Sequence, residues 1–233
     1  MHWIMDRDQR VDHCLSALLV LQCLTLFVMI PLAQRGALGR TLLDICHLAF
    51  AILCVTVLTR HRLLQLVTLG CLALLTAWPL FGHLVSASLQ LDSVQQHEAI
   101  ALVSFVFNGA VTGVVAHHVF AAGRRVTMHR IRGAVLLYLN IAALFAIAYG
   151  AIAMYAPGAF TGTNLHGHGR DGLSAVFTYF SLTTLTTTGF GDIVPTEPLT
   201  RSLANLEAVI GQLFPATLLA RLVALHLAHE DRG

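Results

Sequence analysis

Long uncharged stretches alternate with short polar segments along the chain. If every Asp, Glu and Arg is taken as a boundary, four uncharged runs remain that could each hold a membrane-spanning helix, at 13–34, 63–91, 99–123 and 133–169. Each exceeds the roughly 18 apolar residues that signal such a helix. Two further apolar stretches carry single acids, 41–59 with Asp44 and 199–220 with Glu207. The pattern predicts an all-α integral membrane protein with six transmembrane helices.

The remaining uncharged run, 172–191, is too rich in Ser, Thr and Gly to face lipid. Its first part has a helical pattern from about 172 to 185, and its last part does not. Polar backbone at membrane depth must be shielded by protein. We therefore expect a short helix and a loop that enter the protein between the fifth and sixth helices.

Composition supports this membrane class. Hydrophobic residues make up 56% of the 233 residues and charged residues only 11%, whereas soluble domains average about 25% charged. This excludes a nucleic-acid-binding protein and a large cytosolic enzyme. The five cysteines lie in apolar stretches without metal-ligand spacing, so we expect them to be packing residues.

All 14 basic residues are Arg, which indicates a bacterial source, and their placement predicts the orientation. Cytoplasmic loops of membrane proteins collect basic residues. With the N-terminus inside, the cytoplasmic loops and ends hold Arg7, Arg10, Arg60, Arg62, Arg124, Arg125, Arg130, Arg132, Arg221 and Arg232. The outside keeps Arg35, Arg40, Arg170 and Arg201. We expect a multi-pass protein of the plasma (inner) membrane with both termini in the cytoplasm.

The non-helical part of the 172–191 run ends in Thr187-Thr188-Gly189-Phe190-Gly191-Asp192. A chain that replaces the hydration shell of a cation must aim successive carbonyls at one axis, and glycine tolerates the backbone angles that this requires. The Thr187 hydroxyl is a further oxygen ligand. The preceding helix directs its negative C-terminal end toward such a cation.

TLTTTGFGD, at 184–192, resembles the TMTTVGYGD-type selectivity filter of the potassium channel family, and the resemblance extends over about 134–226. It implies a bacterial homotetrameric channel with a re-entrant pore helix and no enzymatic activity. K⁺ ions would bind in the filter, without an organic cofactor. The K⁺ ligands it implies are Thr187, Thr188, Gly189, Phe190 and Gly191, with Asp192 bracing the mouth.

The resemblance also divides the chain into two parts. Residues 133–233 correspond to the pore domain of the family, and residues 1–132 to its four-helix, voltage-sensor-like domain. The fourth span lacks the arginine repeat of voltage-gated relatives, so we expect no steep voltage response.

Some positions depart from the family pattern. Where relatives carry pore-helix tryptophans this chain has Tyr179 and Phe180, and Phe190 replaces the filter tyrosine. Of these, only Tyr179 has a hydroxyl to offer Asp192. Our hypothesis is a filter less tightly braced from behind and more liable to gate there. Thr183 and Thr184 complete the expected filter support.

Three residues of the sixth span are gating candidates. Gly211 matches the position of the family's inner-helix glycine hinge, and Pro215 removes a backbone hydrogen bond. For both, a hinge and simple close packing remain equal alternatives. Glu207 lies one turn before Gly211, where a structural bond to the pore helix is favoured over attraction of cations.

His166 and His168 form an H-x-H pair in the predicted outer loop. Such a pair near a fourfold axis could bind Zn²⁺ or Cu²⁺ or sense pH. A solvated turret without either role is the favoured alternative.

Two other functions stay open. One is a weakly selective monovalent cation channel, because Thr188 and Phe190 alter the filter. The other is a non-conducting membrane signalling or partner subunit. Expected partners are K⁺, the lipid bilayer and further copies of the chain, with an unknown membrane or cytosolic regulator as a possibility and nucleic acid excluded.

Overall fold

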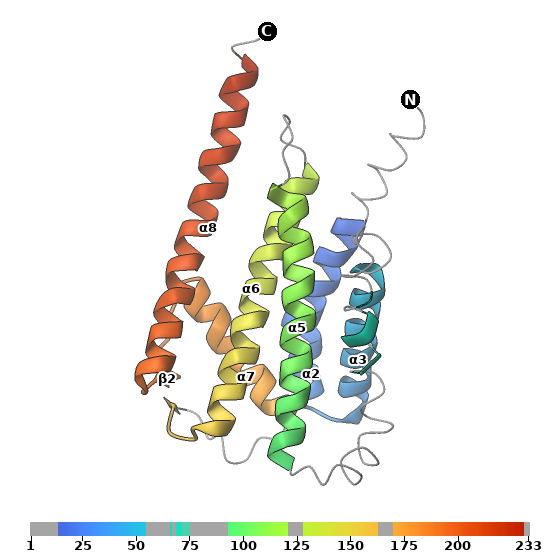
Figure 1. Ribbon diagram of the computed structural model, residues 1–233, viewed down its shortest axis with the longest axis vertical. Helices are drawn as coiled ribbons and strands as arrows, with labels where there is room; N and C mark the ends of the chain where they lie inside the picture. Colours follow the sequence, from blue (N-terminus) through green and yellow to red (C-terminus); the bar gives the residue numbers. More distant parts are fainter. Residues whose placement is uncertain are drawn as a thin grey trace.

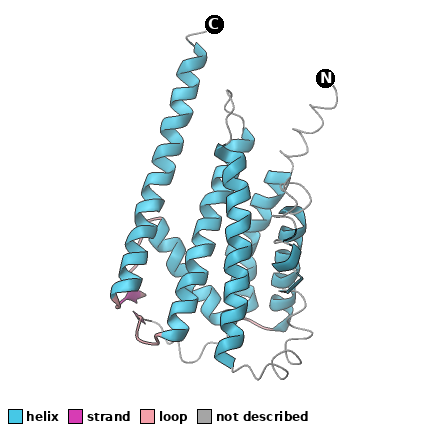
Figure 2. Ribbon diagram, viewed as in Figure 1, coloured by secondary structure: helices cyan, strands magenta, loops and turns pink. Residues whose placement is uncertain are grey.

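The computed structural model describes residues 14–54, 66, 69–71, 73–74, 93–120, 128–162 and 170–230. The described chain is mostly helical, and its longest helices lie side by side (Figure 1). The strands that it contains form one short two-stranded sheet near one end of the molecule (Figure 2).

The first helical stretch runs from Cys14 to Ala33 and includes the π-helix η1 (Thr25–Met29) and α2 (Ile30–Ala33). After Gly36, α3 begins. The remaining elements in chain order are α3 (Ala37–Leu53), α5 (Ser93–Phe120), α6 (Met128–Tyr155), β1 (Phe160–Thr161), α7 (Arg170–Leu185), β2 (Val194–Pro195) and α8 (Pro198–Glu230).

Four helices are long and apolar enough to cross a membrane: Cys14–Ala33, Ala99–His117, Ile131–Tyr155 and Pro198–Arg221. They coincide with the first, fourth, fifth and sixth predicted spans. The second predicted span corresponds in part to α3, which has 17 residues. The third falls largely on residues outside those that the structure describes.

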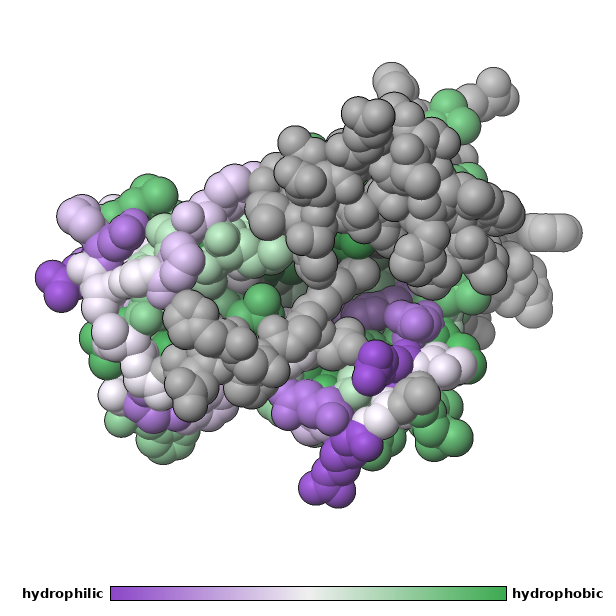
Figure 3. All heavy atoms as spheres, turned by 90° about the horizontal axis from the view of Figure 1, so that it is seen from below, coloured by the Kyte–Doolittle hydropathy of each residue, from purple (hydrophilic) through white to green (hydrophobic). Residues whose placement is uncertain are grey.

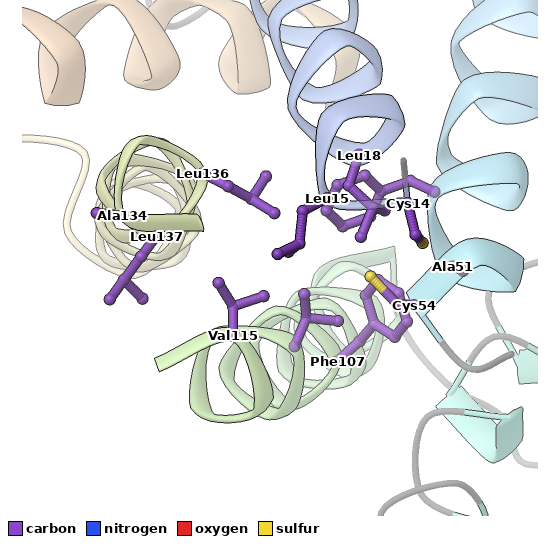
Figure 4. Packing of buried hydrophobic residues seen from close by; sticks show 12 residues of the cluster. Cys14, Leu15, Leu18, Ala51, Cys54, Phe107, Val115, Ala134, Leu136 and Leu137 are labelled. Carbon is purple, nitrogen blue, oxygen red and sulfur yellow. The ribbon is translucent and has the colours of Figure 1, made fainter. Parts of the chain in front are cut away.

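The first helical stretch, α3, α5 and α6 enclose an apolar core. Its members include Leu15 and Leu18 from the first stretch, Phe107 from α5 and Leu136 from α6, which point toward one another (Figure 4). Cys54, which directly follows α3, is also in this core, and neither it nor Cys14 forms a disulfide. This burial agrees with the packing role expected for the cysteines.

Helices α6, α7 and α8 form the other side of the molecule. α7 crosses obliquely between α6 and α8 and packs on both (Figure 1). α8 has few other neighbours, and large apolar side chains along it are exposed in the single chain. These are Leu199, Leu206, Val209, Leu213, Leu219 and Val223. Such a surface requires lipid or further protein around it.

The end of α6 is tied to the start of α8. β1 pairs antiparallel with β2, with Phe160 opposite Pro195. The Thr200 hydroxyl of α8 donates to the Ala159 carbonyl oxygen at 3.2 Å. Seen from this end, hydrophilic side chains gather at the left edge, where α8 begins (Figure 3).

Candidate functional site

The candidate site is the segment 186–192, which we name the filter segment. It leaves the C-terminal end of α7 at Leu185, which lies against Gly211 in the middle of α8. It then leads to β2, which precedes α8 by two residues. The chain therefore enters as a helix to the middle depth of α8 and returns as a non-helical strand to the end from which α8 starts.

Along the filter segment, residues with a positive, left-handed φ alternate with residues of negative φ. The φ angles are positive at Thr187 (56°), Gly189 (51°) and Gly191 (78°), and Thr187 is the only non-glycine residue with positive φ among the described residues. Thr188 and Phe190 between them have negative φ. Alternation of left- and right-handed residues turns successive peptide groups the same way, so N–H groups gather on one side and carbonyls on the other.

The hydrogen bonds identify the two sides. The N–H groups of Thr187, Thr188 and Gly189 donate back to α7, at 2.9 Å to the Thr184 carbonyl and at 2.9 and 3.1 Å to the Thr183 carbonyl. Within the described chain, no backbone hydrogen bond is accepted by the carbonyls of 186–191. These carbonyls are therefore available to a ligand on the side away from α7.

The filter segment is uncovered on that side. All seven of its residues are exposed in the single chain, and the Phe190 side chain is 70% exposed. Free carbonyl oxygens in a row are the ligands that a dehydrated monovalent cation needs. One chain supplies one such row, so a closed ring of oxygens requires further copies.

Two side-chain contacts hold the Thr187 end of the segment. The Gln212 side-chain amide of α8 donates to the Thr187 hydroxyl oxygen at 2.7 Å. The Thr186 hydroxyl donates to the Leu182 carbonyl at 2.7 Å and lies 3.0 Å from the Thr188 hydroxyl. The first contact links the inner surface of α8 directly to the expected innermost ligand.

The other end of the segment is braced by Tyr179 of α7. The Tyr179 ring stacks on the Phe190 ring, with centroids 6.2 Å apart and planes 2° from parallel. The Tyr179 hydroxyl also lies close enough to the Asp192 carboxyl for the two groups to interact. Tyr179 thus lies beside both Phe190 and Asp192, the two filter residues for which the sequence predicted weaker support.

The other expected support residues lie differently. Phe180 is 5% exposed and points away from the filter segment into an aromatic cluster with Tyr149 and Phe160, at centroid distances of 5.0 and 5.5 Å. Thr183 and Thr184 act through their backbone carbonyls, which accept the N–H groups of the filter segment. Phe180 therefore anchors α7 from behind, whereas Thr183 and Thr184 contact the segment itself.

An open cavity of about 410 Å³ adjoins the α7 end of the filter segment. Gly211, Gln212 and Pro215 of α8 line it, together with Tyr138 of α6, whose hydroxyl donates to the Leu185 carbonyl at 3.0 Å. A side chain at Gly211 would overlap the Leu185 carbonyl. Close packing thus accounts for glycine at this position.

Pro215 alters the backbone of α8 next to the contact between Gly211 and Leu185. It lies four residues after Gly211 within α8, and it has no N–H to donate to the Gly211 carbonyl. The helical ladder of α8 is therefore interrupted where α8 meets the end of α7.

Glu207 lies behind the filter segment and not in the cavity. It is completely buried, and its carboxyl accepts a hydrogen bond from the Tyr149 hydroxyl of α6 at 2.7 Å. Its other oxygen is in hydrogen-bond contact with the Ser181 hydroxyl of α7. The residue therefore joins three helices, α6, α7 and α8, through its side chain.

Sequence reasoning missed the partners that these residues find on other helices. Tyr138, Tyr149, Ser181 and Gln212 are polar residues inside apolar helical stretches, and that placement was the available signal. His166 and His168 lie outside the described residues. Among the described residues, no three His, Cys, Asp or Glu side chains gather as a metal site would require.

Comparison with known families agrees with this geometry. Residues 111–226 match a family model described as an ion channel, which spans part of α5, all of α6 and α7, the filter segment and most of α8. The match supports an ion channel in a membrane and not an enzyme. No curated protein and no solved structure matches the chain.

Proposed function

We propose that the chain is the subunit of a K⁺-selective channel, in which four copies place their filter segments around one axis. The observation that carries this proposal is the alternating backbone of 187–191. The N–H groups of Thr187, Thr188 and Gly189 are bonded to α7, and the carbonyls of the segment accept no backbone hydrogen bond within the described chain and lie on an uncovered side. Four such rows supply the cage of oxygens that replaces the hydration shell of K⁺.

The remaining architecture follows from this role. α7 is the re-entrant pore helix, α6 and α8 are the fifth and sixth of six spans, and the first four form a separate membrane domain. Both termini face the cytoplasm of a bacterial cell, because that orientation places most arginines inside. The exposed apolar side of α8 contacts lipid and neighbouring copies.

A pair of glycine variants tests conduction. Neither Gly189 nor Gly113 has an atom within 4 Å of an added Cβ, but only Gly189 has positive φ. Gly189→Ala adds a strain of about 1–2 kcal/mol in every subunit of the pore, whereas Gly113→Ala adds none. In liposomes with an imposed K⁺ gradient, we expect wild type and Gly113→Ala to carry K⁺ flux and Gly189→Ala to lose it.

Equal flux through Gly189→Ala and wild type would contradict the proposal. Loss of flux in both glycine variants would mean that the comparison reports general destabilisation.

A weakly selective cation channel is the second candidate. Phe190 has no hydroxyl to brace the filter from behind, and among the described residues its ring stacks on Tyr179 of the same chain. A filter held by ring stacking alone at this position adapts more easily to Na⁺. Reversal potentials with K⁺ and Na⁺ on opposite sides separate the two candidates.

A further inference from the structure

The buried carboxyl of Glu207 is the most unusual group outside the filter segment. Its side chain is fully buried between α6, α7 and α8, and Leu203 and Ala204 of the preceding turn pack on the aromatic cluster of α6 and α7. Burial of an ionised carboxylate at such a depth raises the free energy of the folded protein unless a cation pairs with it. Within the described residues, no basic side chain forms an ion pair with Glu207.

The ionisable groups that face Glu207 from the neighbouring helices are two tyrosines of α6. Tyr149 donates its hydroxyl hydrogen to Glu207 Oε2, whereas Tyr138, farther along the same helix, donates to the Leu185 carbonyl and lies only within electrostatic range of the carboxyl. From α7 the facing group is the Ser181 hydroxyl. None of these groups carries a positive charge that would compensate a carboxylate.

The hydrogens around Ser181 can be counted. Ser181 Oγ lies 2.7 Å from the Ala142 carbonyl oxygen and also within hydrogen-bond contact of Glu207 Oε1. A serine hydroxyl has one hydrogen, and a carbonyl oxygen has none. If Glu207 were ionised, one of the two contacts would join two oxygen atoms with no hydrogen between them.

A protonated Glu207 satisfies every contact. Tyr149 donates to Oε2, the carboxylic acid donates from Oε1 to Ser181 Oγ, and Ser181 donates to the Ala142 carbonyl. The result is one continuous chain of hydrogen bonds from α6 through α8 and α7 back to α6. Fully satisfied buried networks of this kind fix the relative position of the elements that they join.

We infer that Glu207 is held as a neutral carboxylic acid, and that its proton locks the pore helix α7 to α6 and α8 in the conducting arrangement. Loss of the proton at alkaline pH leaves an unpaired buried charge, and the single Ser181 hydrogen can then serve only one of its two contacts, with Glu207 or with the Ala142 carbonyl. α7 is then released behind the filter segment. Glu207 is a positioning residue and does not touch the permeating ion. The effect on conduction rests on the proposed channel function, but the protonation state does not.

Glu207→Gln is the matched variant, because the amide copies the neutral acid. It donates to Ser181 Oγ from Nε2 and accepts from Tyr149 at Oε1, and it has no proton to lose at alkaline pH. We expect wild-type K⁺ flux in liposomes to fall about tenfold when the pH is raised from neutral to alkaline. The reason is that ionisation of Glu207 removes one hydrogen bond from the buried network beside a charged group. Glu207→Gln keeps its flux over the same range.

Tyr149→Phe provides a second test that keeps the buried ring. A hydrogen bond to a carboxylate is stronger than one to a neutral acid, so removal of the hydroxyl disfavours ionisation. The alkaline loss of flux should therefore move to higher pH. A purely structural role for Tyr149 would lower flux equally at all pH values. An unchanged profile, or an alkaline loss that persists in Glu207→Gln, would overturn the inference.

Infrared difference spectra of the purified protein separate this inference from the channel function. Subtraction of the Glu207→Gln spectrum from wild type at neutral pH should leave a carboxylic-acid C=O band, which disappears at alkaline pH. A carboxylate band at neutral pH would overturn the inference even if the protein conducts K⁺. An acid band in a protein that carries no K⁺ would support it while the channel proposal fails.

Discussion

Thr187 is the residue at which the backbone is most unusual. Positive φ in a β-branched residue costs about 1–2 kcal/mol. Two bonds hold Thr187 in this conformation, its N–H to the Thr184 carbonyl and its hydroxyl oxygen to the Gln212 amide. The Gln212 bond uses one lone pair of the hydroxyl oxygen and leaves the other for a cation. Gln212 therefore orients the Thr187 hydroxyl, which the sequence predicts to be a cation ligand.

Replacement of Gln212 tests this role. Gln212→Ala removes a hydrogen bond with a net worth of about 1 kcal/mol in each subunit, and we expect K⁺ flux to fall at least about fivefold. Leu213→Ala is the control, because Leu213 is the exposed neighbour on the same helix and its apolar side chain cannot hydrogen-bond to the filter segment. Equal flux in the two variants would show that the Gln212 contact does not support conduction.

Tyr179 is the second residue with a distinct expectation. Tyr179→Phe keeps the ring that stacks on Phe190 and removes the hydroxyl that interacts with Asp192. We expect single-channel records to show shorter openings, because the mouth of the filter loses its brace. Phe190→Tyr adds a hydroxyl at the facing position and should lengthen openings. If neither variant changes open times, bracing at this end does not govern the stability of the filter.

Helix α7 contacts α8 at the point where α7 ends and where the backbone hydrogen bonding of α8 is interrupted. α7 ends at Leu185, and α8 at this depth has glycine at position 211 and lacks one backbone hydrogen bond because of Pro215. The contact is too close for any side chain at Gly211. Movement of α8 at this point therefore displaces the end of α7 and the Thr187 end of the filter segment.

Gly211→Ala should destabilise this contact. Overpacking of a tight contact costs about 1–3 kcal/mol, so we expect a lower thermal unfolding temperature in detergent. Gly109→Ala, in α5, adds a Cβ where nothing lies within 4 Å, and it serves as the control. An unfolding temperature for Gly211→Ala equal to that of Gly109→Ala would contradict the packing role.

The helix from 172 to 185 is an element that the sequence predicted well, since α7 spans Arg170–Leu185. Its polar residues and the glycines after it are local signals. The partners of those residues are not local. Tyr138 and Gln212 reach the site only because α6 and α8 pack against α7, and no spacing along the chain encodes that register. Phe180 was expected to support the filter, and its side chain lies on the other face of α7, which depends on how the helix is rotated.

At the scale of the whole molecule, the main buried core lies away from the filter segment. The core of the first helical stretch, α3, α5 and α6 is closed, while α8 and the filter segment remain exposed in one chain. A fourfold ring would cover both. Native mass spectrometry of the detergent-solubilised protein should therefore show a complex of four chains. A monomer or dimer as the only species would contradict the proposed assembly.

The most direct measurement is the reversal potential of the purified protein in a planar bilayer with K⁺ on one side and Na⁺ on the other. A K⁺-selective filter drives the reversal potential strongly toward the K⁺ equilibrium value, and Gly189→Ala abolishes the current. A reversal potential near zero, with current that survives in Gly189→Ala, would contradict the assignment of residues 187–191 as a K⁺ filter.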